Sequence, residues 1–437
     1  MKTSIPRHLP AGTRTVPVTR NQAGRLALAR GAERWRKPPC SFGLRLQGEV
    51  NPDLLEEVLT HVARRHTALR TTFPDYEPSG SGLLLPTDQV HWNLTRVDLR
   101  GIPQPARQRA EDAAFRKVQE PFAPDEFPLF RGSLLRYEED YVLTVAVDHM
   151  VFDGESIQVF LGEFGRFYQQ LACGSTADLA DDGGGSDFGE FSAFECDWLQ
   201  SPEAGDALVH WKSVWDGFGP FPPTRIPVRD VEGSGALWRQ SLPADVVHAR
   251  RRRFSGGYLS LPAFAAAAVL AALRDMTGQT EGGVLHPSSR RFTDATQGMI
   301  GYLNNRTLLR ADTPLGADLY QIAAITRAAM VDALEHQMMP FEVLLDHFAP
   351  QLRNRRPDRP YIHLNVQASP VLPSLPGLNA SLFWPPQSSA LQDIPWISVD
   401  LEDGREHMVL TAGYSTGKFE PDLVSELMAR VAGHLTG

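Results

Sequence analysis

Apolar and polar positions alternate along the first part of the chain with two different periods. Residues 41–50 alternate between apolar and polar side chains, which predicts a strand. In residues 51–70 the apolar side chains recur every three or four positions, which predicts a helix capped by Asn51 with Pro52 in its first turn. The apolar face of this helix consists of Leu54, Leu55, Val58, Leu59 and Val62.

The next pattern predicts a hairpin followed by a long helix. Two short apolar runs, 133–137 and 141–147, flank an acidic turn, and the second run leads directly into Asp148. After Gly154 the period becomes helical. The apolar face of this second helix consists of Ile157, Phe160, Leu161, Phe164, Phe167 and Leu171. Residues 148–154 are therefore expected at a strand-to-helix junction.

The second half of the chain repeats the mixture of helices and strands. Helices are predicted at 262–275, 317–336, 340–348 and 421–435, and strands near 281–286, 361–369, 394–400 and 407–413. A Gly-, Ser- and Asp-rich stretch at 173–191 favours a boundary near residue 180, which gives an N-terminal lobe at 1–180 and a C-terminal lobe at 181–437. A Pro-rich crossing loop is expected near 370–390, and the alternation predicts two layered α/β lobes.

Length and composition support a folded protein of two lobes. A chain of 437 residues exceeds the size of one hydrophobic core, so two lobes of roughly 200 residues each are expected. The formal net charge of −9 argues against a phosphate-binding surface, and thus against nucleic acid as a partner. The basic run Arg250–Arg253 predicts a solvated face, or else a surface that meets an acidic carrier protein.

Location and metal content are also limited by the sequence. The three cysteines are too few and too scattered for a disulfide framework or a zinc site. Residues 1–20 lack the apolar core of a secretory signal. The longest apolar stretch, 261–273, falls short of the about 20 residues that a membrane span needs. We therefore expect a cytoplasmic protein with no membrane partner and no catalytic metal.

The predicted strand-to-helix junction carries the chemistry. Residues 147–154, VDHMVFDG, contain the pattern HxxxDG directly after a strand. Without further motifs, a histidine at a strand end is more often a buried structural side chain. Other segments of the chain change that interpretation.

Five further segments occur in the order found in one family. In chain order they are NQAGRL at 21–26, RHTALRTTF at 65–73, GMIGYLNN at 298–305, EHQMMPFE at 335–342 and YSTGKF at 414–419. Together with the HxxxDG segment they resemble the condensation domains of nonribosomal peptide synthetases, in the chloramphenicol-acetyltransferase-like superfamily. The resemblance covers nearly the whole chain.

The resemblance implies two chloramphenicol-acetyltransferase-like lobes that form a V with a central tunnel. A donor acyl group arrives on the phosphopantetheine of an acyl or peptidyl carrier protein, and the enzyme needs no cofactor of its own. His149 is implied to orient the acceptor and shuttle its proton, which suits an imidazole. Gly154 allows close approach of the arm, and its amide at a helix start is a candidate oxyanion donor.

The same resemblance assigns roles to the remaining motif residues. Asp153 is implied to point away from substrate and to pair with Arg291, with Arg290 as the alternative. Asn304 and Asn305 are expected either to line the tunnel or to hydrogen-bond a turn. Ser156 is a candidate tunnel residue because it completes a pattern shared with another branch of the superfamily.

One departure from the family leaves an alternative open. Asp148 replaces the first histidine of the usual HHxxxDG, a position that is commonly structural. Asp148, Asp153 and Ser156 also match the DxxxxDxxS signature of heterocyclisation domains. Retention of His149 and the condensation-like strand IHLNVQAS at 361–369 favour condensation over cyclisation.

We therefore expect a free-standing condensation enzyme of antibiotic biosynthesis. It would join a carrier-tethered acyl or aminoacyl thioester to a small-molecule or carrier-bound amine or alcohol, giving an amide or ester. A catalytically silent recruitment domain is a second interpretation. An acyltransferase that uses acyl-CoA is a third, disfavoured because the DFG of residues 187–189 lies mid-chain rather than near the C-terminus.

Overall fold

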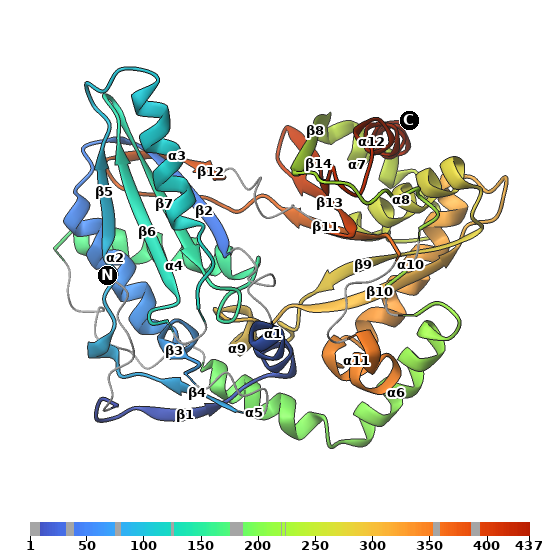
Figure 1. Cartoon of the computed structure of the whole chain (residues 1–437), viewed down its shortest axis with the longest axis horizontal. Coiled ribbons are helices and arrows are strands. Elements are labelled where there is room, and N and C mark those ends of the chain that lie inside the picture. The colour runs from blue at the N-terminus through green and yellow to red at the C-terminus, as the bar shows by residue number, and fades with distance from the viewer. Residues whose placement is uncertain are drawn as a thin grey trace. The chain divides into compact units, whose positions relative to one another are not determined.

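The computed structural model describes the chain in two compact units (Figure 1). The first unit takes in residues 1–200, 289–304 and 370–386, and the second takes in 201–288, 305–369 and 387–437. The described residues leave out 1–8, 32–38, 75–79, 124–125, 175–186, 220, 223, 353–358 and 386–393, and the side chains of 28–31.

The first unit is built on a five-stranded sheet, in which every neighbouring pair is antiparallel except β5–β6. Its strands, in spatial order, are β12 (Leu378–Phe383), β2 (Cys40–Gly48), β7 (Asp140–Val147), β6 (Phe130–Arg136) and β5 (Leu94–Asp98). A small sheet holds β1 (Arg14–Pro17), β4 (Ser81–Leu84) and β3 (Thr71–Thr72). The helices are α1 (Arg20–Gly31), α2 (Pro52–Arg65), α3 (Ala106–Val118), α4 (Ser156–Ala172), α5 (Phe188–Trp198) and α9 (Asp294–Gln297), with 3₁₀ turns at Thr67–Arg70 and Thr87–Gln89.

The five-stranded sheet has an apolar core on each face, because successive strand side chains point in opposite directions. Leu134 and Leu143 point to the larger core, where they join residues of α2 and α4. Leu135 and Val142 point to a smaller core that includes Phe115 of α3. Figure 1 shows α3 lying along this sheet. The central strands of the sheet are thus buried on both faces, and β7 leads from there directly into the HxxxDG segment.

The second unit contains a six-stranded mixed sheet. Its strands, in spatial order, are β10 (Asn305–Asp312), β9 (Glu281–Ser288), β11 (Tyr361–Ala368), β13 (Trp396–Asp403), β14 (His407–Ser415) and β8 (Gly235–Pro243). β11 runs parallel to β9 and β13. The helices are α6 (Pro202–Trp215), α7 (Ala244–Arg252), α8 (Leu261–Thr277), α10 (Leu319–Glu335), α11 (Phe341–Phe348) and α12 (Pro421–Thr436), with a 3₁₀ turn at Pro350–Leu352.

Most elements predicted from periodicity are present within a few residues. The Asn51 side chain caps α2 by accepting from the N–H groups of Asp53 and Leu54. α2 ends at Arg65, however, and the predicted remainder of that helix is a 3₁₀ turn. Among the described residues, no helix is long and apolar enough to cross a membrane.

The units differ from the lobes predicted around residue 180. Phe188 and Phe191 of α5 are buried in the core of the first unit, so this unit continues to residue 200. The Pro-rich segment expected as a crossing loop belongs to the first unit and contains β12, which pairs with β2. Local glycine and proline content marked loops in both places but did not reveal these tertiary contacts.

Two buried histidines give the fold a defined response to acid. Burial lowers the pKa of His66 to about 3 and that of His286 to about 4. Because the unfolded chain takes up protons on these groups near pH 6.5 and the folded chain does not, stability is lost as the pH falls below 6.5. The loss approaches about 1.4 kcal/mol per pH unit for each histidine.

We expect the free energy of unfolding of His66→Leu to fall less steeply with decreasing pH than that of the wild type. Urea unfolding of wild type and variant between pH 7 and pH 4.5 measures it, with His407→Leu as the control because His407 is exposed. An acid dependence that His66→Leu leaves as steep as in wild type would contradict the assignment.

Candidate active site

The HxxxDG segment begins with a tight turn at the end of β7. The carboxylate of Asp148 accepts a hydrogen bond from the N–H of Met150 at 2.7 Å, and the Asp148 carbonyl accepts from Val151 at 3.1 Å. Burial raises the pKa of Asp148, and the positive charge of Arg25 opposes that rise. The Asp148 side chain therefore stabilises the turn by accepting from the backbone N–H of Met150.

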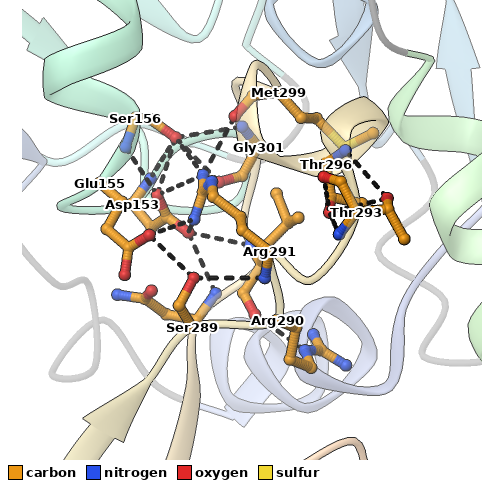
Figure 2. Close-up of polar contacts among 12 residues, drawn as sticks. Asp153, Glu155, Ser156, Ser289, Arg290, Arg291, Thr293, Thr296, Met299 and Gly301 are labelled. Atoms are coloured by element: carbon orange, nitrogen blue, oxygen red, sulfur yellow. Dashed lines mark hydrogen bonds and ion pairs between the residues drawn. The ribbon is translucent and has the colours of Figure 1, made fainter.

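Asp153 lies at the centre of a buried polar cluster (Figure 2). Its carboxylate receives two hydrogen bonds from the Arg291 guanidinium, at 2.9 and 2.8 Å. The backbone N–H groups of Leu303 and Asn304 each donate to the same carboxylate at 3.0 Å. The Asp153–Arg291 pair is the one that the family resemblance implies, and Arg290, the alternative, is placed elsewhere.

Ser156 completes this cluster. Its hydroxyl donates to Asp153 at 2.8 Å and accepts from the Gly301 N–H at 3.2 Å and from Arg291 at 3.0 Å. The six residues that share these bonds, called the Asp153 cluster below, are Asp153, Ser156, Arg291, Gly301, Leu303 and Asn304.

Charge and burial in the Asp153 cluster favour the ionised pair. The Asp153 side chain is 0% exposed and that of Arg291 is 5% exposed. Burial alone would raise the pKa of Asp153, but the Arg291 guanidinium and the hydrogen bonds from Ser156 outweigh it and hold this pKa below its ordinary value. A carboxylate so enclosed is shielded from solvent, and the Ser156 hydroxyl is fully buried as well.

The segment after Arg291 passes close to α5. A Cβ atom on Gly301 would lie 2.3 Å from the Phe188 ring, so only glycine fits at this position. The side chains of Met299 and Leu303 are buried in the larger core of the unit. Gly301 of the GMIGYLNN segment is therefore needed for close packing against Phe188.

A second buried ion pair lies beside the Asp153 cluster. Arg290 is 0% exposed, pairs with Glu195 of α5, and donates to the Leu303 carbonyl at 2.8 Å. Glu195 also accepts from the N–H of Arg20 at 2.6 Å, at the start of α1. The family motifs did not predict this pair. One signal was present in the sequence, since Glu195 falls at helical spacing with the buried Phe188 and Phe191.

Helix α1 contacts both functional segments. The side-chain amide of Gln22 donates to the Met150 carbonyl at 2.7 Å. The side-chain amide of Asn21 donates to the Asn304 carbonyl at 2.8 Å. These contacts give the NQAGRL segment a physical role, which is to join the HxxxDG loop to residues 299–304.

His149 is the partly exposed member of the loop, between buried neighbours. Its imidazole meets the Tyr302 ring edge-on, with 4.9 Å between centroids. Gly154 lies two residues before α4, where its backbone is exposed and its carbonyl accepts from Ile157 at 3.3 Å. In the loop whose Asp153 is fixed, Gly154 is thus exposed, and His149 is partly exposed with its Nδ1 atom buried.

The two neighbouring asparagines have different surroundings. Asn304 bonds to Asp153 and Asn21 through its backbone. Asn305, at the start of β10, donates from its side-chain amide to two carbonyls and accepts from the Phe341 N–H at 2.9 Å. Asn305 therefore organises a turn of the second unit, whereas a substrate role for Asn304 or Ser156 stays a prediction.

A thiol also lies near the loop. Cys40, opposite Val147 in the sheet, has its pKa raised to about 12 by burial and by the charges of Asp153 and Asp148. A thiol of such high pKa is a weak nucleophile at neutral pH. Within the described part of the chain, no group of three or more His, Cys, Asp or Glu side chains could hold a metal ion.

The fold and the loop geometry define a mixed α/β protein of the chloramphenicol-acetyltransferase-like class. The chain belongs to the condensation domain family, whose family model matches residues 13–436. It is similar to a linear gramicidin synthase protein of Brevibacillus parabrevis, with 31% identity over 314 residues. That match covers 69% of this chain but 4% of the relative, so the chain spans a small part of the relative's length.

Solved structures share the fold at lower identity. The X-domain in complex with OxyB from teicoplanin biosynthesis has a TM-score of 0.79 and 20% identity, and the match covers 100% of this chain and 95% of that chain. The first condensation domain of the calcium-dependent antibiotic synthetase has a TM-score of 0.76 and 17% identity, with 97% and 96% covered.

We expect loss of either partner of the buried pair to destabilise the first unit. Asp153→Asn leaves the Arg291 charge uncompensated, and Arg291→Met leaves the Asp153 charge uncompensated. We expect either change to lower the free energy of unfolding by about 3–5 kcal/mol. Urea unfolding measures the effect, with Lys117→Met as the control because the Lys117–Glu120 pair is exposed. Equal stability of Arg291→Met and Lys117→Met would contradict this account.

Proposed function

We propose that the chain catalyses condensation of a carrier-tethered acyl or aminoacyl thioester with an amine or alcohol. The observation that carries the proposal is the partly exposed His149 in a loop whose carboxylates, Asp148 and Asp153, are buried and held by hydrogen bonds. An accessible imidazole is the residue type best suited to exchange a proton near neutral pH.

The proposed reaction balances without a cofactor. The acceptor nitrogen or oxygen attacks the thioester carbonyl, and His149 orients the acceptor and takes its proton. The carbon–sulfur bond breaks as the new carbon–nitrogen or carbon–oxygen bond forms, and the proton passes to the leaving phosphopantetheine thiolate. The N–H of Gly154, close to the start of α4, is the proposed donor to the oxyanion.

Positioning carries much of the proposed rate increase. An amine attacks a thioester readily once both are held together, whereas an alcohol depends more on a base. The partner is therefore proposed to be a phosphopantetheine-bearing carrier protein, and the acceptor a small molecule or a second carrier-bound group.

A second candidate function is partner recruitment without catalysis. Two observations favour it: the replacement of the first motif histidine by Asp148, and the similarity to an X-domain whose structure was solved with OxyB. The retained His149 and its accessibility favour catalysis.

The two functions are separated by one assay. Candidate carrier proteins are loaded with acyl or aminoacyl groups, mixed with the protein and amine or alcohol acceptors, and the products are identified by mass. We expect His149→Ala to lower turnover by about 100-fold or more, with the exposed His407→Ala as the control. Equal turnover by wild type and His149→Ala would remove His149 from the chemistry. Binding of a partner enzyme without any turnover would favour recruitment.

A further inference from the structure

The Tyr302 ring contacts both a cation and the proposed base. Its centroid is 4.9 Å from that of His149, with the two planes at 65°. The guanidinium carbon of Arg25 lies 5.7 Å from the same centroid. We propose that Tyr302, held by Arg25, is a positioning residue that fixes the orientation of the His149 imidazole. The kinetic part of this proposal rests on the proposed function; the geometric part does not.

The backbone on both sides of Tyr302 is fixed by the Asp153 cluster. On one side, the N–H of Gly301 donates to the Ser156 hydroxyl. On the other side, the N–H of Leu303 donates to Asp153. A side chain between two anchored residues has little freedom of direction. The aromatic ring therefore reaches His149 from a rigid support, which is what a positioning role needs.

Arg25 is brought to the ring by α1. Asn21 and Gln22 anchor this helix to the Asn304 and Met150 carbonyls. Arg25 follows one turn later on the same side of the helix, because residues three and four apart are neighbours there. The same α1 contacts that join the two segments thus place Arg25 over Tyr302.

The charge of Asp148 favours this position of Arg25. Asp148 is 7% exposed, and the positive charge of Arg25 acts on it favourably. In this chain an aspartate stands where the family usually has its first histidine. We infer that the buried carboxylate attracts Arg25, which in turn attracts the face of Tyr302.

The physical basis is the charge distribution of aromatic rings. The face of an aromatic ring is negative and its edge positive, so a cation over the ring and an edge-on neighbour are both favourable. Removing the ring would take the edge-on contact away from the imidazole and so change its preferred orientation. A misplacement of about 1 Å in a catalytic group can cost about 100-fold in rate.

The chain offers a matched control for the loss of a tyrosine ring. Tyr141, near the start of β7, also has an arginine over its ring, with the Arg136 guanidinium carbon 5.5 Å from the centroid. It is six residues from the end of β7, or about 20 Å along an extended strand. Tyr141→Leu therefore removes the same kind of pair far from His149.

The first test does not depend on activity. Proton–carbon NMR of histidine-labelled protein follows the His149 ring, whose signal is assigned as the one missing in His149→Ala. We expect Tyr302→Leu to shift this signal and Tyr302→Phe to retain it, because the ring current comes from the aromatic ring. A signal unchanged in Tyr302→Leu, or shifted equally by Tyr141→Leu, would overturn the proposal.

The second test uses the condensation assay. We expect Tyr302→Leu to lower kcat by about 10- to 100-fold with little change in KM, and Tyr302→Phe to restore most of it. Arg25→Gln should lower kcat less, and the double variant with Tyr302→Leu should lose less than the product of the two. Equal losses in kcat for Tyr302→Leu and Tyr141→Leu would count against positioning. If wild type shows no turnover with any loaded carrier, the proposed function fails while the NMR result still decides the geometry.

Discussion

The buried carboxylate of Asp153 is the constraint on which the functional loop depends. It accepts from Arg291, from Ser156 and from two backbone N–H groups of residues 303 and 304. Segments more than a hundred residues apart in sequence are thereby joined with every bond inside one compact unit. A buried ion pair adds little net stability once the free-energy cost of removing both charges from water is counted. Removing one partner, however, strongly destabilises the fold. We interpret it as a device that fixes one arrangement of the loop.

The residues in and next to the HxxxDG segment therefore have different roles. Asp148 closes the turn and Asp153 anchors it, and both are buried. His149 and Gly154 lie between and beside them with access to solvent. The rigid part of the loop thus carries the part that we propose to meet substrate, as expected where geometry must be precise.

Local patterns predicted much of the fold. The β6–β7 hairpin follows from the two apolar runs at 133–137 and 141–147, and α4 follows from the helical period after Gly154, so the junction that carries the motif was predicted. The boundary predicted near residue 180 differs from the end of this part of the first unit at residue 200, because Phe188 is buried among core residues that are distant in sequence. β12 was not predicted, because the prolines around it indicate a loop and the strand forms by pairing with β2.

The site was predictable only where a motif was recognisable. The Asp153–Arg291 pair was expected from the family resemblance, whereas the Arg290–Glu195 pair and the Tyr302 contact arise from tertiary packing. Asp153 holds residues 303 and 304 in place by accepting from their backbone N–H groups. Amide hydrogen exchange tests this directly: in Asp153→Asn we expect exchange at these two amides to speed up by at least about tenfold more than at the amides of β6 and β7, which report the loss of overall stability. Unaltered protection of both amides would contradict the account.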